Sequence, residues 1–299
     1  MKKLLLGLLF IMTIIPSVLL ARRDCLQQAE LDAFGRTMRP EKDTYAPSPS
    51  GHFYIHFDTT GNAAPDLMDS DGNGVPDYVD EVGIIADSAH YVLVDMMEYE
   101  EEPYDGEGGY DIYIMSYAAG VYGFNYKDNV NTSYLQIDND YVGYNSVFNL
   151  TPLQIMRITV GHEYFHAIHW GYEENLGSNA YFYEMSAMWF EDVLIPDGND
   201  YLDGWTDDLL DDPTADFDNT GNGYELALFG HYLSSFIDPN GQFDAKQSTI
   251  MREIWSRFSD CTETNTSLDC NNRGAFYAVE DIVEYNYNTT FIETWTDFM

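Results

Sequence analysis

One segment, residues 159–172 (TVGHEYFHAIHWGY), constrains the fold more than any other because it contains the sequence H-E-x-x-H. Residues four apart lie on the same face of a helix, so His162 and His166 can offer two imidazole ligands to one metal ion. Glu163 lies beside them, where its carboxylate can take a proton from a water molecule that the metal activates. A fold that uses these residues must supply a helix under the motif and a third ligand from elsewhere in the chain.

The flanking residues predict that the motif lies on a well-bounded helix. In the sequence Thr151-Pro152-Leu153-Gln154, threonine is the N-cap, proline takes the first helical position and glutamine follows three residues after the cap. Gly171 is a typical terminator, so we expect the helix to run to about Trp170. Two core histidines stacked on one helix face would show the same spacing, but the capped helix favours the metal site.

A second predicted helix, from about Ala180 to Leu194, offers the third ligand. Glu184 follows His166 by eighteen residues, enough for the chain to turn back and lay this helix against the first. Glu191 shares a face with Glu184 and is the alternative third ligand. It could instead hydrogen-bond a ligating histidine, a role for which Asp192 competes.

A hydrolytic site of this kind also needs a donor to the developing oxyanion. Tyr224 and His231 lie seven residues apart on one predicted helix, and either could reach the site; His231 is preferred because tyrosine, with 24 residues, is abundant here. His169 lies about 10 Å from His162 along a straight helix, too far to share its ion, so we expect it to pack. An extended substrate could pair with the edge of a strand such as SYLQID, residues 133–138.

The stretch DSDGNGVPDYVD, residues 69–80, has the ligand spacing of a twelve-residue calcium loop. Gly74 stands at the sixth position, where the chain must turn sharply to aim successive oxygens inward. The last position holds aspartate in place of glutamate, which would weaken the site, and a solvated acidic turn before a helix is the alternative. The expected ligands are five side chains and one carbonyl: Asp69, Asp71, Asn73, Val75 (carbonyl), Asp77 and Asp80.

The charge balance limits the partners. The chain has 299 residues, of which 13 are basic and 51 acidic, and its formal net charge is -38. Such a surface repels nucleic acid and anionic membranes, so we expect a protein or peptide substrate, neutral or basic in character, and no nucleic acid. Hydrophobic residues make up 45% of the chain, which is enough for a substantial core.

Residues 1–21 have the pattern of a secretory signal peptide. Lys2-Lys3 precede an apolar run from Leu4 to Leu20, and Ala21 follows. A membrane anchor is the alternative, but the run of about 17 residues is at the short limit for spanning and Pro16 interrupts it. We therefore expect a secreted protein with no stable membrane anchor after cleavage.

The remaining organisation is that of one domain. Residues 22–50 are polar and proline-containing, and are expected to form an irregular leader over the surface of a domain at 51–299. The last segment, FIETWTDFM, carries no terminating signal, which is compatible with a longer protein. Cys261 and Cys270 enclose a short polar loop and are expected to form a disulfide, which leaves Cys25 free or paired outside the chain.

Hydrophobic spacing predicts an α+β fold: a small mixed N-terminal sheet with a helix that carries the H-E-x-x-H motif, followed by a mainly helical C-terminal half. We expect strands at 52–58, 111–118 and 132–140, and helices at 78–98, 152–170, 180–194, 224–237, 248–258 and 274–285.

The segment HEYFHAIHWGY followed by YEMSAMWFED resembles the gluzincin metallopeptidases, in which a glutamate in an E-x-x-A-x-W-x-E setting on the next helix completes H-E-x-x-H. SGHFYIHFDTTG and DSDGNGVPDYVDEV, upstream, are similar to a little-characterised group of secreted bacterial metalloproteases, and the likeness extends from about residue 50 to 233. It implies a zincin-like fold, peptidase activity, zinc held by His162, His166 and Glu184, and Glu163 as general base. Met185 departs from the small residue common in the wider class, but it is no ligand.

Two other functions fit the same residues. One is a non-catalytic, calcium-dependent surface or adhesive module with a structural or vestigial zinc site. The other is a zinc hydrolase of non-peptide bonds. The presence of Glu163 argues against the first, because a purely structural site needs no base.

Overall fold

A six-stranded mixed sheet forms the N-terminal half of the computed structural model, with strand order β1-β5-β6-β4-β3-β2. The model describes residues 25–30, 38–106, 108–128, 131–143, 150–174, 177–202, 205–211, 217, 223–263 and 274–299. Parallel pairs are β1–β5, β6–β4 and β4–β3, while β5–β6 and β3–β2 are antiparallel. The strands are β1 (Leu26–Gln28), β2 (Thr44–Pro47), β3 (Phe53–Phe57), β4 (Tyr110–Met115), β5 (Gly123–Lys127) and β6 (Ser133–Asp138).

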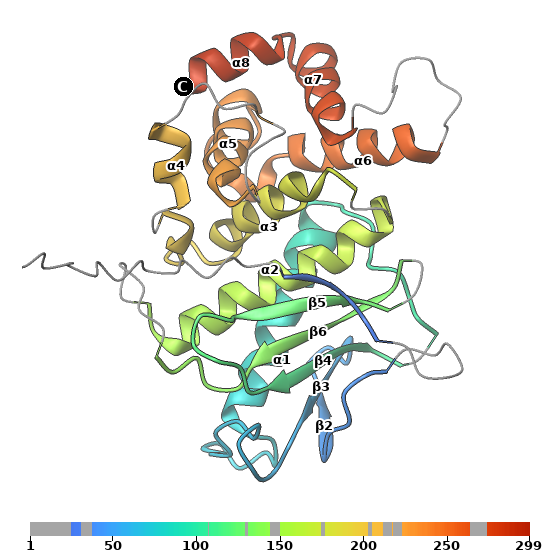
Figure 1. Cartoon of the computed structure of the whole chain (residues 1–299), viewed down its shortest axis with the longest axis vertical. Helices are drawn as coiled ribbons and strands as arrows, with labels where there is room; N and C mark the ends of the chain where they lie inside the picture. Colours follow the sequence, from blue (N-terminus) through green and yellow to red (C-terminus); the bar gives the residue numbers. More distant parts are fainter. Residues whose placement is uncertain are drawn as a thin grey trace, which may run out of the picture.

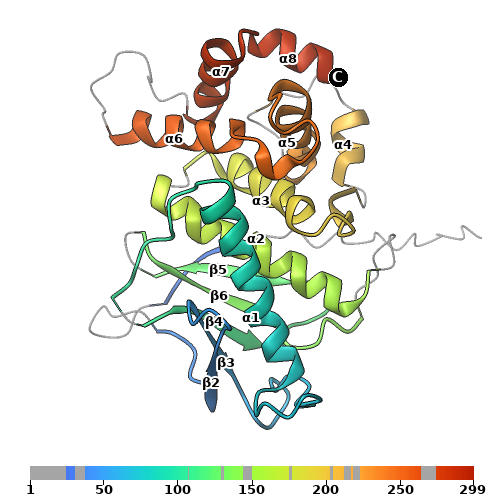
Figure 2. The same ribbon diagram turned by 180° about the vertical axis from the view of Figure 1, so that it is seen from behind.

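Helices α1 and α2 lie against one face of this sheet, and α3 to α8 stack beyond α2 (Figures 1 and 2). A π-helical turn, η1 (Tyr91–Met96), continues α1, and a 3-10 turn, η4 (Tyr224–Leu226), precedes α5. A second π-helical turn, η5 (Leu233–Ile237), follows α5. Two further 3-10 turns are η2 (Asp200–Leu202) and η6 (Ala245–Gln247). The α-helices are α1 (Asp77–His90), α2 (Pro152–Tyr172), α3 (Ala180–Leu194), α4 (Trp205–Asp211), α5 (Ala227–Tyr232), α6 (Ile250–Glu263), α7 (Gly274–Tyr287) and α8 (Phe291–Phe298).

Helix α2 is the central element. The sheet and α1 cover one of its sides, and α3 and α6 pack on the other, so its side chains from Ile155 to Trp170 are nearly all buried. Its N-terminus has the predicted capping box: the backbone N–H of Gln154 donates to the Thr151 hydroxyl, and that of Thr151 donates to the Gln154 side chain. A helix buried on both sides can carry polar groups only where other elements supply partners for them.

The structure confirms a mixed α/β chain with the sheet in its N-terminal half and helices through its C-terminal half. Helix α2 passes the predicted terminator and ends at Tyr172. Gly171 lies inside the last turn, where a β-carbon would lie 3.6 Å from Pro103 and from the carbonyl of Glu101. These are ordinary van der Waals distances, so Gly171 neither ends the helix nor is required by the packing of the neighbouring loop.

Two expectations about the sheet are corrected. The described parts of residues 22–50 are not an irregular leader throughout, because they supply the outer strands β1 and β2. The segment SYLQID forms β6, which lies between β5 and β4 and is buried along its whole length, so it offers no free edge. The strand next to the outermost one is β5, which the sequence does not reveal because its buried positions hold Gly123 and Asn125 and not apolar residues.

The leader is also held on the sheet face opposite the helices. Arg39 stacks over the ring of Tyr134 and forms ion pairs with three carboxylates, including Asp105 at 2.6 Å. The other two carboxylates are Asp111 and Asp128. Tyr134 alternates along β6 with Leu135, which faces the helices, so this arginine secures the leader to the far side of the sheet.

Some expectations fall on residues outside those described. These include the signal peptide at 1–21 and the partner cysteine of the expected disulfide, Cys270. Within the described ranges, no helix combines the length and the apolar character needed to cross a bilayer.

The close passage of β5 over α2 gives a first prediction. A β-carbon at Gly123 would lie 2.8 Å from the Thr159 methyl and 2.9 Å from the carbonyl of Gln136, which the β-ladder holds in place. We expect Gly123→Ala to lower the free energy of unfolding by about 1–3 kcal/mol, because overpacking displaces backbone. Gly171→Ala, whose nearest contact is 3.6 Å, is the control and should leave stability unchanged or raise it by about 0.5–1 kcal/mol. Equal urea midpoints for the two variants would contradict this account.

Candidate metal centre

Helices α2 and α3 bring the three predicted zinc ligands to one point. The Nε2 atoms of His162 and His166 are 3.1 Å apart, and Glu184 Oε2 lies 3.2 Å from the first and 3.4 Å from the second. All three side chains are buried. Glu184 faces the two histidines because α3 returns along α2, the arrangement that the eighteen-residue spacing predicted.

A fourth side chain, Cys25, joins this cluster. Its Sγ lies 3.4 Å from His162 Nε2, 3.3 Å from His166 Nε2 and 3.1 Å from Glu184 Oε1. The four ligand-type atoms all lie within 4.8 Å of one another. Sequence reasoning missed this residue because Cys25 stands alone in the leader, without the spacing that marks a zinc ligand.

The side chain of Glu191 supports the cluster from behind. Its Oε1 lies 2.6 Å from His162 Nδ1, so the imidazole donates its Nδ1 proton to this carboxylate and turns its Nε2 lone pair toward the cluster. Of the two roles open to Glu191, the geometry favours orientation of a ligand. The competitor, Asp192, instead lies beside His231, with 3.8 Å between Oδ2 and Nε2.

His169 packs, as predicted, but it also orients a ligand. Its Nδ1 lies 3.2 Å from His166 Nδ1, its Nε2 lies 3.1 Å from the Ser186 hydroxyl, and its ring stacks on Trp255. Burial lowers the pKa of His169 well below its ordinary value, and the two neighbouring histidines add to this effect. A neutral His169 that donates from Nε2 to Ser186 can accept at Nδ1 the proton of His166, whose Nε2 lone pair then faces the cluster.

These donors match what zinc takes in proteins: two imidazole Nε2 atoms, a carboxylate and a thiol. Burial by itself raises the pKa of Glu184, but His166 and His162 outweigh it and lower this pKa to about 2, so the carboxylate is ionised. Burial, with the charges of Glu163 and Glu184, raises the pKa of Cys25 well above its ordinary value. Without a metal, the thiol is therefore protonated and donates to Glu184.

The predicted base, Glu163, follows the first ligand on α2 and lies beneath the edge of the sheet. Its backbone carbonyl accepts a hydrogen bond from the Asn125 side chain at 3.0 Å, and Asn125 in turn accepts from Trp170 at 2.8 Å. A β-carbon at Gly123 would lie 3.3 Å from Glu163 Cγ, so β5 passes directly over this side chain. Glu163 thus lies next to the ligand cluster in sequence and beneath β5 in space.

Of the two predicted oxyanion donors, the structure brings Tyr224 to the cluster. Its hydroxyl lies 3.8 Å from Cys25 Sγ and its ring centroid 6.2 Å from that of His162. Gly223, with φ of 87°, places this tyrosine, because a β-carbon there would lie 1.9 Å from the carbonyl of Tyr181. His231 contacts Asp192 and stacks near Tyr201 instead, and burial lowers its pKa to about 4.

The predicted calcium loop adopts the expected sharp turn. Gly74 has φ of 92°, and the backbone N–H groups of Gly72, Asn73 and Gly74 all donate to the carboxylate of Asp69. Asp80 lies in the first turn of α1 and accepts from the Asn73 side chain at 2.8 Å.

Four of the predicted calcium ligands line one open hollow: Asp71, Asn73, Asp77 and Asp80. Asp77 is engaged there by Ser70, whose backbone N–H and hydroxyl both donate to it. The aspartates do not converge as the His–His–Glu cluster does: among the described residues, only two groups of ligand-type side chains approach within 4.8 Å, and the loop is not one of them. Calcium binding by this loop, including the carbonyl of Val75, stays a prediction.

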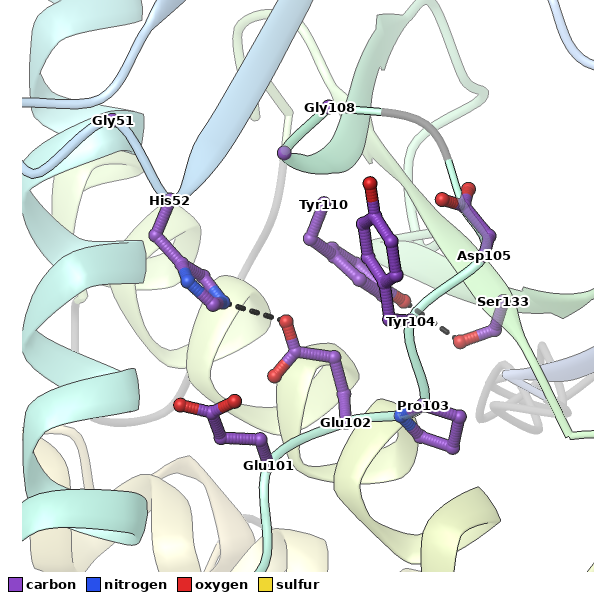
Figure 3. Close-up of a pocket in the computed structure, with 11 residues that line it drawn as sticks. Gly51, His52, Glu101, Glu102, Pro103, Tyr104, Asp105, Gly108, Tyr110 and Ser133 are labelled. Carbon is purple, nitrogen blue, oxygen red and sulfur yellow. Dashed lines mark hydrogen bonds and ion pairs between the residues drawn. The ribbon is translucent and has the colours of Figure 1, made fainter.

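The other converging group is His52, His90 and Glu102, beside a hollow of about 270 Å³ that Figure 3 shows. Glu102 Oε1 lies 2.6 Å from His52 Nε2, and the hydroxyl of Tyr164 donates to Glu102 Oε2 at 2.6 Å. Tyr164 belongs to the H-E-x-x-H segment of α2, so this network ties the loop after α1 to the helix that carries the ligands. Each ligand-type atom here has a partner, which indicates a structural role.

Comparisons of the chain with protein-family models, with curated proteins and with solved structures gave no match.

The pKa values of His52 and His90 should shift in opposite directions from the ordinary value of histidine. Burial lowers the pKa of His52, but the hydrogen bond and charge of Glu102 outweigh it, and the net pKa is raised above the ordinary value. Burial and the neighbouring His52 lower the pKa of His90. The stabilisation from the His52–Glu102 pair is therefore complete below pH about 6.5 and lost as the pH rises through the raised pKa.

NMR titration of the imidazoles checks this. We expect the His52 midpoint above that of His90, and Glu102→Gln to lower the His52 pKa. Glu100→Gln, at an exposed acid two residues away, is the control. An unchanged His52 midpoint in the Glu102 variant would contradict the assignment.

Proposed function

We propose that this protein is a secreted zinc-dependent endopeptidase of the gluzincin kind. The observation that carries the proposal is the convergence of His162 Nε2, His166 Nε2 and the Glu184 carboxylate at 3.1–3.4 Å, with Glu163 adjacent on the same helix. Both histidines have their Nδ1 atoms engaged by buried partners, which leaves the Nε2 lone pairs for a cation. We also propose that the protein has a zincin-like fold and that it is secreted.

His162, His166 and Glu184 would hold the zinc ion. The chemistry that zinc supplies in such a site is polarisation of a carbonyl and a lowering of the pKa of water toward neutrality. Glu163 acts as the general base: its carboxylate takes a proton from the attacking water and delivers it to the amine that leaves when the peptide bond breaks. The Tyr224 hydroxyl, buried next to the cluster, is the donor best placed for the developing oxyanion.

The substrate chain would be held by the sheet. Strand β5 passes over Glu163, and main-chain hydrogen bonds from its outer edge would align an extended peptide along the cluster. The net charge of -38 favours neutral or basic peptides.

The role of Glu163 as general base can be tested in a chain that lacks the Cys25 thiol. We expect a Cys25→Ala chain to cleave a library of short peptides, which need not pair with β5, and the Cys25→Ala/Glu163→Gln chain to lose activity by at least about 10²-fold, because no other carboxylate is adjacent to the ligands on α2. Metal analysis should show one zinc per chain in both.

Two outcomes would contradict the proposal. If both chains hold one zinc and are equally inert toward peptides, esters and amides, the site is not catalytic and a binding module remains. If they hydrolyse esters or amides but no peptide, the protein is a hydrolase of another class.

We also propose that the loop at residues 69–80 binds calcium and stabilises the N-terminal half. A cation that binds only the folded chain stabilises it by about 2.7 kcal/mol at a hundred times its dissociation constant. Calcium should therefore raise the melting temperature, and Asp71→Ala should abolish that rise. Asp66→Ala, at an exposed acid just outside the twelve positions, is the matched control. A melting temperature that calcium does not move in the unmodified chain would refute the site.

A further inference from the structure

The position of the Cys25 side chain is that of a fourth metal ligand. Its Sγ lies at nearly equal distance, 3.1–3.4 Å, from the three predicted zinc ligands, and the side chain is only 2% exposed. A zinc ion in a closed site takes four ligands, often including cysteine, whereas a catalytic site keeps one position open. With Cys25 in place the donor set is that of a closed site.

The backbone of the leader holds Cys25 there. The carbonyl of Cys25 accepts from the N–H of Asn125 at 2.9 Å, and the N–H of Ala29 donates to the carbonyl of Lys127 at 2.9 Å. Between these bonds, β1 pairs with β5 in parallel, with Leu26 opposite Asn125 and Gln28 opposite Lys127. The thiol is therefore delivered to the cluster by a strand of the sheet and not by a flexible tail.

The same strand covers the edge that a substrate would use. β5 pairs with β6 on its other side, so β1 occupies its remaining hydrogen-bonding edge. Gln28 adds a side-chain hydrogen bond to the Lys127 carbonyl at 2.8 Å. An extended peptide and β1 cannot pair with β5 at once.

Farther along the chain, ion pairs hold the leader against the domain. Arg39, one of only 13 basic residues, contacts three aspartates, and Lys42 pairs with Asp58 at 3.0 Å. The leader is thus bound to the domain by β1 at the cluster and, farther along the chain, by the ion pairs of these two cations.

We propose that residues 25–30 are an intramolecular inhibitor. The Cys25 thiolate is the fourth zinc ligand and closes the site to every substrate, whereas β1 blocks only the edge that a long, extended substrate would use, so the enzyme is latent until the leader is removed. This inference rests on the proposed zinc peptidase. On binding, the thiol loses its proton to solvent and a sulfur–zinc bond forms. On activation that bond breaks, the sulfur regains a proton, and a water molecule takes the vacated position. No oxidant or reductant is involved.

Metal ligation by Cys25 can be tested without an activity assay, in the full chain loaded with Co²⁺ in place of zinc. A thiolate–cobalt charge-transfer band is expected in the unmodified chain and is expected to be absent in Cys25→Ala at the same cobalt content. The Cys261→Ser/Cys270→Ser chain, which keeps Cys25, is the control and should retain the band. A cobalt-loaded, unmodified chain without the band overturns ligation by Cys25.

Latency is tested with the zinc forms. At equal zinc content, Cys25→Ala should cleave a short peptide at least tenfold faster than the unmodified chain. Equal, Glu163-dependent rates overturn latency while the peptidase stands. If the cobalt band is present but neither chain cleaves the peptide, the proposal of a zinc peptidase is wrong. The proposal of latency is then wrong as well, and Cys25 is a structural ligand.

Discussion

The contact between α2 and α3 is the interaction on which the rest of the structure depends. It places two imidazoles and a carboxylate within 3.1–3.4 Å of one another in a buried position, where unpaired polar groups are costly. Gly161 permits the approach, since a β-carbon there would lie 2.6 Å from Leu194 of α3. The sheet then covers the opposite side of α2, so the ligands are enclosed by packing on both sides.

The groups behind the ligands show how the cost of burial is offset. Glu191 accepts from His162, and His169, held by Ser186 and Trp255, accepts from His166. Each ring nitrogen that does not face the cluster thus has a partner, and that partner sets the tautomer of the ligand. The cluster is preorganised by hydrogen bonds within the helical layer, and rigid helices carry all of these groups.

Helix α2, its capping box and the approach of Glu184 to the two histidines could be predicted because they depend on short-range rules. Capping acts over three residues, the two histidines are one turn apart, and α3 follows after a short connection. Strand β1 was missed because its partner β5 lies about a hundred residues away along the chain. Strand β5 was missed because its buried positions hold Gly123 and Asn125 in place of apolar residues. Tyr224 and His231 were expected on one face of one helix, but Tyr224 lies in a 3-10 turn next to Cys25 and His231 lies in α5 beside Asp192.

The sequence by itself determined the helix that carries H-E-x-x-H, the helix that brings Glu184 to it, the mixed α/β class and the turn of the acidic loop, because each follows from local periodicity, capping or glycine conformation. Only the tertiary structure decided that Glu191 orients a ligand, that His169 fixes the tautomer of another, and that Cys25 enters the cluster. These placements depend on strand pairing and helix packing between distant segments, and a lone cysteine carries no local signal of the partners it will meet.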